Sequence, residues 1–210
     1  MKYFIDCGAH LGESIVRAKE EFGEDITIIS FEPIPYFANE ISKIYKNDKN
    51  ILIQNSLVWI ENGTKKFYIS PIFTDGSSIY SDMNCGELKE DLYIEVPCFD
   101  FSEWIGKTFS QNDYLIVKLD IEGAEYEVLH KMGIDGTLNL VNEFYGEFHY
   151  NKLGNEEAKK KAIQVYEGLL YMGIHFKLWE TFVPLNTHID GIVDRPETLL
   201  IVVENNRWKK

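Results

Sequence analysis

The stretch that decides the fold is Lys2-Tyr-Phe-Ile-Asp-Cys-Gly-Ala-His-Leu-Gly-Glu-Ser-Ile-Val16. Its first apolar residues predict a short strand that ends at Asp6, and a helical pattern begins near Glu13. Gly8 and Gly12 bracket a tight turn between them, which glycine allows because it tolerates positive φ. Strand, glycine turn and helix is how α/β proteins bring backbone N–H groups close to a ligand. The stretch therefore predicts an α/β fold with a ligand site at this turn.

A second acidic residue bears on the kind of ligand. Glu32 closes the next apolar run, about twenty residues beyond the glycines, where a strand-end carboxylate can accept hydrogen bonds from ribose hydroxyls. A dinucleotide fingerprint requires Gly-x-Gly-x-x-Gly, whereas only Gly8 and Gly12 are present, with His10 between them. The turn resembles instead the Asp-x-Gly-x-x-x-Gly loop of S-adenosylmethionine (SAM) methyltransferases. In that loop Asp6 would lie near the ammonium group of the cofactor.

The composition predicts one folded domain and restricts its partners. A chain of 210 residues with 45% hydrophobic residues is long enough to bury a core. The formal net charge of −13 disfavours a nucleic-acid partner, because an acidic surface repels phosphate. We expect no signal peptide, and no apolar run is long enough to span a membrane. Three cysteines without a Cys-x-x-Cys pair indicate a reducing compartment and no zinc site, so we expect a cytoplasmic protein.

The start of the chain lies directly on its first predicted strand. We therefore expect either a minimal domain spanning residues 1–210 or a module of a longer polypeptide, such as one joined to a glycosyltransferase.

Strand and helix patterns alternate along the chain, which predicts a doubly wound, mostly parallel sheet. The turn Asn62-Gly63 predicts a small hairpin insertion between residues 57–60 and 66–69. Helices are expected at residues 13–22, 36–45, 124–132 and 156–172. Strands are expected at residues 3–6, 26–31, 50–58, 93–101, 114–119, 138–149, 175–179 and 198–204.

Acidic residues follow many of the predicted strands. Ligands bind at the carboxyl ends of strands in such sheets, so these residues are expected at one edge. Neighbouring carboxylates repel one another, so a cluster of them is typical of a site where a bound cation or a hydroxyl-rich ligand stabilises their charge. The acidic strand ends are Asp6, Glu32, Asp120 with Glu122 and Glu125, Glu147, and Glu180.

Four motifs in this order resemble the FkbM family of SAM-dependent methyltransferases over about residues 3–150. They are Asp6-Cys-Gly-Ala-His-Leu-Gly12, Phe31-Glu-Pro-Ile-Pro35, Ser77-Ser78 and Val117-Lys-Leu-Asp-Ile-Glu-Gly-Ala-Glu125. The last motif is the most specific. His10 stands where the family usually has Asn, and both side chains can hydrogen-bond.

The resemblance implies a class I, Rossmann-like methyltransferase fold with a seven-stranded sheet whose last strand is antiparallel. It also implies O-methylation, often of sugar hydroxyls, with SAM as the methyl donor. The implied cofactor contacts run from the methionine moiety to the ribose, the adenine and the methyl group. The methionine moiety would be held by Asp6, Gly8, Ala9, His10 and Gly12, and the ribose by Glu32. The adenine would lie near Ser56 and Leu57, and the methyl group beside Asp120.

A sugar hydroxyl is a poor nucleophile, so a group near the transferred methyl must activate it. The candidate general bases are His149, Asp120 and Glu122. Alternatively, a divalent cation could bind the acceptor oxygen, and oxygen-rich ligands favour Mg²⁺ or Mn²⁺. The candidate cation ligands are Asp120, Glu122, Glu147 and His149.

For the residues around these candidates we expect mainly structural roles. Lys118 is expected to be a buried partner for one of the acids, and Glu125 a first-turn helix acid. Tyr150 and Trp179 could stack on a sugar face.

Three functions stay open on the sequence. The first is an O-methyltransferase acting on a carbohydrate or a glycosylated small molecule, with neither nucleic acid nor membrane as partner. The second is an NAD-dependent oxidoreductase, which the glycine spacing and the lack of a Tyr-x-x-x-Lys set disfavour. The third is a non-catalytic nucleoside-binding module on the same fold.

Overall fold

The main sheet of the computed structural model has six parallel strands in the order β3-β2-β1-β7-β8-β9. The structure describes residues 1–72, 74–84 and 86–179. The strands of this sheet are β1 (Lys2–Cys7), β2 (Thr27–Phe31), β3 (Ile51–Gln54), β7 (Tyr114–Leu119), β8 (Glu143–Gly146) and β9 (Phe176–Lys177). The helices are α1 (Glu13–Phe22), α2 (Pro35–Ile44), α3 (Phe101–Thr108), α4 (Glu125–Asp135) and α5 (Glu156–Tyr171), with 3₁₀ turns η1 (Thr74–Gly76) and η2 (Thr137–Leu140).

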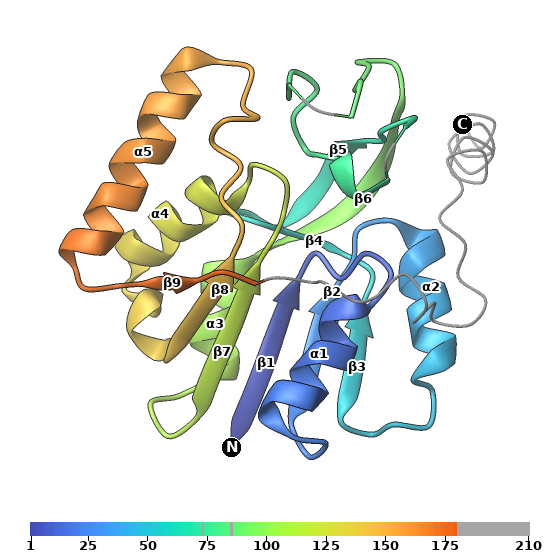
Figure 1. Cartoon of the computed structure of the whole chain (residues 1–210), viewed down its shortest axis with the longest axis vertical. Coiled ribbons are helices and arrows are strands. Elements are labelled where there is room, and N and C mark those ends of the chain that lie inside the picture. The colour runs from blue at the N-terminus through green and yellow to red at the C-terminus, as the bar shows by residue number, and fades with distance from the viewer. Residues whose placement is uncertain (73, 85, 180–210) are drawn as a thin grey trace.

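The two central strands, β1 and β7, are buried almost throughout, because helices cover both faces of the sheet (Figure 1). Helix α1 lies in front of the sheet and α3 lies behind it in this view. Both strands run in the same direction, in register from Lys2 opposite Tyr114 to Cys7 opposite Leu119. Their carboxyl ends therefore meet at one edge. The predicted doubly wound parallel architecture is confirmed.

A second, three-stranded sheet replaces the predicted hairpin. It contains β4 (Leu57–Trp59), β6 (Tyr93–Asp100) and β5 (Gly63–Tyr68) in that order. β6 lies between the other two, parallel to β4 and antiparallel to β5, so the predicted pairing of residues 57–60 with 66–69 is wrong. Asn62 does not close a two-residue hairpin turn. Its side chain accepts a hydrogen bond from the Asp100 backbone N–H (3.2 Å) and donates one to Glu103 (3.1 Å), at the start of α3.

Two other predicted strands are shorter than expected. The run of residues 50–58 divides into β3 and β4, because Asn55 turns the chain between the sheets and donates to the carbonyls of Glu32 (2.8 Å) and Pro33 (3.0 Å). The run of residues 138–149 begins with the turn η2 and contributes only the four residues of β8. The predicted antiparallel strand at residues 198–204 lies outside the described residues and stays a prediction.

The aromatic core reaches across β1 to Trp179, whose side chain is only 1% exposed. The Trp179 ring lies 5.1 Å from that of Phe4 and 5.0 Å from that of Tyr145. The predicted stacking of Trp179 on a sugar is therefore wrong, because the ring is occupied by core packing. Tyr150 is 47% exposed and stays a candidate for such a contact. None of the described helices combines the length and apolar character needed to cross a bilayer.

Candidate active site

A cavity of about 390 Å³ opens where the parallel strands end. Cofactor-sized pockets in α/β proteins occur at this edge. Both the glycine turn after β1 and the acidic loop after β7 contribute to its wall. Of the predicted cofactor residues, those that line it are Gly8, Ala9, His10, Glu32, Ser56, Leu57 and Asp120. Asp6 and Gly12 do not line it. Lining residues that the sequence did not single out include Glu13, Ser14, Val58, Phe67 and Asp75.

The glycine turn is shaped by left-handed backbone conformations. Gly8, His10 and Gly12 have φ values of 87°, 46° and 89°. A Cβ atom on Gly8 would lie 2.0 Å from the carbonyl oxygen of Asp120, so glycine at this position lets the turn pack against the loop after β7. His tolerates the left-handed region better than most residues, as Asn does. This shared tolerance explains how His10 can stand where Asn is usual.

Glu32 is held at the wall of the cavity by two backbone N–H groups. Its carboxylate accepts from His10 N and Ile34 N, both at 2.8 Å. Burial raises the pKa of Glu32 to about 7, although the hydrogen bond from Ile34 opposes the shift. Each oxygen keeps lone-pair capacity for a further donor. The position fits the predicted contact with ribose hydroxyls.

Asp6 is fully buried and serves a different purpose from the one predicted. One of its oxygens lies 3.2 Å from the Lys118 ammonium, and the other accepts from Ser30 at 3.1 Å. Lys118 also donates to the Gly8 carbonyl (2.9 Å) and lies 3.4 Å from Asp120. The structure therefore argues against direct contact between Asp6 and the ammonium group of a cofactor. It makes Lys118 the buried structural partner that the sequence suggested.

Burial and pairing act in opposite directions on this ion pair. Burial raises the pKa of Asp6, and the Lys118 charge opposes that rise. Burial alone would lower the pKa of Lys118, but the charges of Asp6 and Asp120 outweigh it, so this pKa is raised. Lys118 is therefore a permanent cation at this edge of the sheet.

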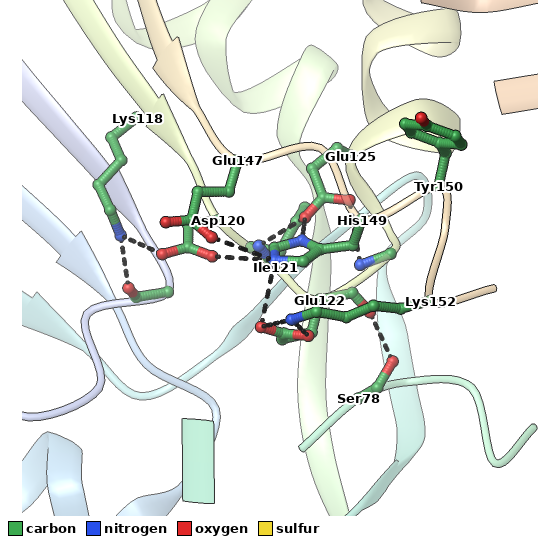
Figure 2. Close-up of polar contacts among 12 residues, drawn as sticks. Ser78, Lys118, Asp120, Ile121, Glu122, Glu125, Glu147, His149, Tyr150 and Lys152 are labelled. Carbon is green, nitrogen blue, oxygen red and sulfur yellow. Dashed lines mark hydrogen bonds and ion pairs between the residues drawn. The ribbon is translucent and has the colours of Figure 1, made fainter. Parts of the chain in front are cut away.

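His149 stands at the centre of a second cluster, on the loop after β8. Its side chain is 3% exposed, and Nδ1 lies 2.9 Å from the Glu125 carboxylate. Figure 2 shows Asp120, Glu122 and Glu125 arranged around the His149 ring, with Lys118 on the far side of Asp120.

Glu125 begins α4, as its predicted role in the first turn requires, but its side chain is completely buried. It accepts from the backbone N–H groups of Ile121 and Gly123, both at 3.0 Å, and it orients His149. This second role was missed by sequence reasoning. The partner lies 24 residues away, and no local signal marks the pair.

The other ring nitrogen of His149 faces three carboxylates at ion-pair distance but makes no hydrogen bond to them. Nε2 lies 3.3 Å from Glu122, 3.6 Å from Glu147 and 3.9 Å from Asp120. It is buried and has no hydrogen-bond partner among the described residues. The predicted catalytic residues Asp120, Glu122 and His149 thus converge, with their ligand atoms within 4.8 Å of one another.

Charge interactions within this cluster shift the pKa of two groups. Burial alone would lower the pKa of His149, but the hydrogen bond to Glu125 and the nearby carboxylates raise it to about 9. Burial raises the pKa of Glu122 to about 7, and the charges of His149 and Lys152 oppose that rise. The Lys152 ammonium lies 3.1 and 3.3 Å from the two Glu122 oxygens.

Glu122 is one of few non-glycine residues with a positive φ, at 49°. Ser78, the second serine of the Ser77-Ser78 motif, donates a hydrogen bond to the Glu122 carbonyl at 2.7 Å and holds this conformation. Strained backbone of this kind concentrates at functional sites. The strain turns the Glu122 side chain toward His149 (Figure 2).

A larger, mostly apolar cavity of about 730 Å³ lies between α4 and α5. Tyr126, Leu153 and Leu169 are among its lining residues, and none of the predicted site residues belongs to the wall. We assign the cofactor to the smaller cavity, because the strand ends, the glycine turn and the polar groups all meet there.

A doubly wound parallel sheet, a glycine turn after β1 and a buried carboxylate after β2 together define a Rossmann-like fold with a nucleoside-cofactor site, the arrangement found in SAM-dependent methyltransferases. Comparison with protein families agrees. Residues 6–168 match the family described as Methyltransferase FkbM domain, and the chain belongs to this family. A search of curated proteins found no match.

Proposed function

We propose that the protein is a SAM-dependent O-methyltransferase that methylates a hydroxyl of a sugar or glycan by in-line transfer. The observation that carries this proposal is that one cavity is lined by both halves of the required machinery. The cofactor-side residues Gly8, His10 and Glu32 share its wall with Asp120 and Glu122 of the loop after β7. An acidic wall suits an acceptor rich in hydroxyl donors.

The cofactor side has a residue suited to each part of SAM. Glu32 would accept from the ribose hydroxyls, and the backbone of Gly8, Ala9 and His10 would hold the methionine moiety. Ser56, Leu57 and Val58 would lie along the adenine. When bound, SAM supplies an electrophilic methyl group on a sulfonium.

The acceptor side is assigned to the cluster around His149. Asp120 lines the cavity and lies between Lys118 and His149. From this position it can orient the acceptor hydroxyl next to the transferred methyl. Glu122, with its pKa near 7, and His149 are the other groups able to hold or move the hydroxyl proton. The partner expected from these groups is a carbohydrate or glycosylated small molecule. Nucleic acid and membrane are not expected partners, and the expected compartment remains the cytoplasm.

Calorimetric titration with S-adenosylhomocysteine and, separately, NAD tests the donor half. Wild type should bind S-adenosylhomocysteine, and Glu32→Ala should weaken binding at least about tenfold, because a buried ribose contact is worth more than 1.4 kcal/mol. Glu24→Ala, which changes a side chain that is 79% exposed, is the matched control and should bind normally. Binding of NAD instead would favour an oxidoreductase, and binding of neither ligand would favour a non-catalytic module.

Transfer of labelled methyl groups from SAM to a panel of sugars tests the acceptor half. Turnover that Asp120→Ala abolishes without loss of S-adenosylhomocysteine binding would support the proposed function. If the panel shows no turnover and Asp120→Ala changes nothing measurable, the O-methyltransferase assignment fails.

A further inference from the structure

We propose that His149, Asp120 and Glu122, with Glu147 at the rim, form a site for one divalent cation of the Mn²⁺ and Mg²⁺ class, which binds two neighbouring oxygens of the acceptor. The ligand set follows from the sequence, and the structure supplies the geometry. The cation's part in methyl transfer rests on the proposed function. Its binding to the protein does not.

The first observation is the unsatisfied ring nitrogen of His149. A buried polar atom without a partner costs free energy, so its presence needs an explanation. Glu125 can only accept, so in the neutral ring Nδ1 carries the proton and Nε2 presents its lone pair to the cluster. A carboxylate that fixes a histidine in this way is the usual outer partner of a metal-bound imidazole.

The second observation is the spacing of the atoms around Nε2. Ligands about 2.1 Å from one octahedral ion lie about 3.0 Å apart when adjacent and about 4.2 Å apart when opposite. The distances from Nε2 to Glu122, Glu147 and Asp120 are 3.3, 3.6 and 3.9 Å, so each carboxylate is within a few tenths of an ångström of one of these two spacings or between them. Asp120 and Glu147 have partly exposed side chains (29% and 48%), so small rotations can complete the ligand set.

The third observation is charge. Four carboxylates surround the His149 ring, because Glu125 lies on its Nδ1 side and Asp120, Glu122 and Glu147 lie on its Nε2 side. The nearby lysine charges are Lys118, which is shared with Asp6, and Lys152, which pairs with Glu122. The Lys152 ammonium occupies both Glu122 oxygens, so it competes with a cation for this ligand.

The donor set selects the ion. One imidazole nitrogen with two or three carboxylate oxygens, and no thiolate, suits Mn²⁺ or Mg²⁺ better than zinc. Four protein ligands in an octahedral shell leave two positions open. Two adjacent positions fit a vicinal diol, or a hydroxyl beside another oxygen, and such pairs are abundant in sugars.

The chemical step balances without a further reactant. The acceptor oxygen forms a bond to the methyl carbon as the carbon–sulfur bond breaks, and sulfur keeps the electron pair as a neutral thioether. The cation lowers the pKa of the acceptor hydroxyl. The hydroxyl proton passes to a carboxylate at the rim, where Glu147 is 48% exposed and can release it to water.

Electron paramagnetic resonance of added Mn²⁺ tests the site directly. Chelator-treated wild type should bind one Mn²⁺, and His149→Ala should weaken binding by at least about tenfold. Lys152→Gln should bind more tightly than wild type, because the competing ammonium is removed. Lys161→Gln, which removes an equal charge from α5 at a side chain that is 66% exposed, should match wild type. Absence of Mn²⁺ binding by wild type, or equal binding by His149→Ala, would overturn the site.

Titration of S-adenosylhomocysteine into the same variants separates this inference from the proposed function. If S-adenosylhomocysteine binds and methyl transfer continues in excess chelator, the cation's part in methyl transfer fails and the O-methyltransferase stands. If Mn²⁺ binds to wild type but S-adenosylhomocysteine does not, the cation site stands and the O-methyltransferase proposal fails. A sugar bearing a cis-diol should react at least about tenfold faster than its monodeoxy analogue, since one chelating oxygen is lost, and equal rates would overturn the chelation.

Discussion

Two buried base–acid clusters stand side by side at the carboxyl ends of the strands, and they differ in how completely they are paired. Lys118, on β7, has Asp6, the Gly8 carbonyl and Asp120 within 3.4 Å. His149 has Glu125 on one ring nitrogen and no hydrogen bond on the other. A saturated cluster holds the fold, whereas an unsaturated cluster is ready for a ligand. The difference suggests how structural charge and a proposed ligand site can be told apart within one edge of a sheet.

The largest expected effect is the loss of the saturated pair. Lys118→Met leaves the Asp6 carboxylate buried without its cation and should lower the free energy of unfolding by about 3–5 kcal/mol. Urea denaturation followed by circular dichroism measures this. Lys107→Met, at an exposed lysine of α3, should change stability by less than about 0.5 kcal/mol. Equal effects in the two variants would remove the structural role assigned to Lys118.

The unsaturated cluster should respond in the opposite way. His149→Gln should reduce methyl transfer by about 100-fold or more, because the acceptor hydroxyl loses its activating group. The stability loss should be smaller than that of Lys118→Met, since Glu125 keeps its two backbone donors. Steady-state rates and urea denaturation of the same preparations measure both quantities. A stability loss as large as that of Lys118→Met would show that the two clusters do not differ.

A smaller effect is expected at Glu32, a single buried carboxylate apart from both clusters. Its pKa of about 7 means that it ionises near neutrality, and only the ionised form accepts fully from ribose hydroxyls. S-adenosylhomocysteine affinity should therefore rise about tenfold between pH 6 and pH 8, as the ionised fraction does. Calorimetry across this range should show the rise in wild type. A rise that persists in Glu32→Gln would assign the titration to another group.

The last expected effect is a pH dependence of stability. The folded-state pKa of His149 is raised to about 9, so the folded state binds more protons than the unfolded state between the unfolded value of 6.5 and about 9. Stability from this group is complete below pH 6.5 and is lost as the pH rises through 9. Lys118 does not titrate in this window, because its pKa is raised further. Denaturation midpoints should fall across the window in wild type, and less steeply in His149→Gln.

Much of the main sheet could be predicted because its signals are local. The bounds of α1 and β7 agree with the apolar periodicity of residues 13–22 and 114–119. Acids after the strands, such as Glu32 and Asp120, were expected at one edge, and parallel strands bring them there.

The remaining features depend on contacts distant in sequence. β6 pairs with β4 and β5 across the loop of residues 69–92, so the local signal of Asn62-Gly63 was outweighed. Asp6 is buried because Lys118, on another strand, neutralises it. The pairing of Glu125 with His149 joins α4 to the loop after β8, and no local sequence pattern predicts it.

The positive φ of Glu122 has a consequence for how this protein could be improved or damaged. A glutamate in the left-handed region costs about 1 kcal/mol relative to glycine, and its partly buried carboxylate adds a further penalty. Selection for thermal tolerance alone would therefore favour glycine at this position and would remove a proposed ligand. If Glu122 is the proposed ligand, stability and activity are in direct conflict at this residue, and stabilising mutations should be sought elsewhere.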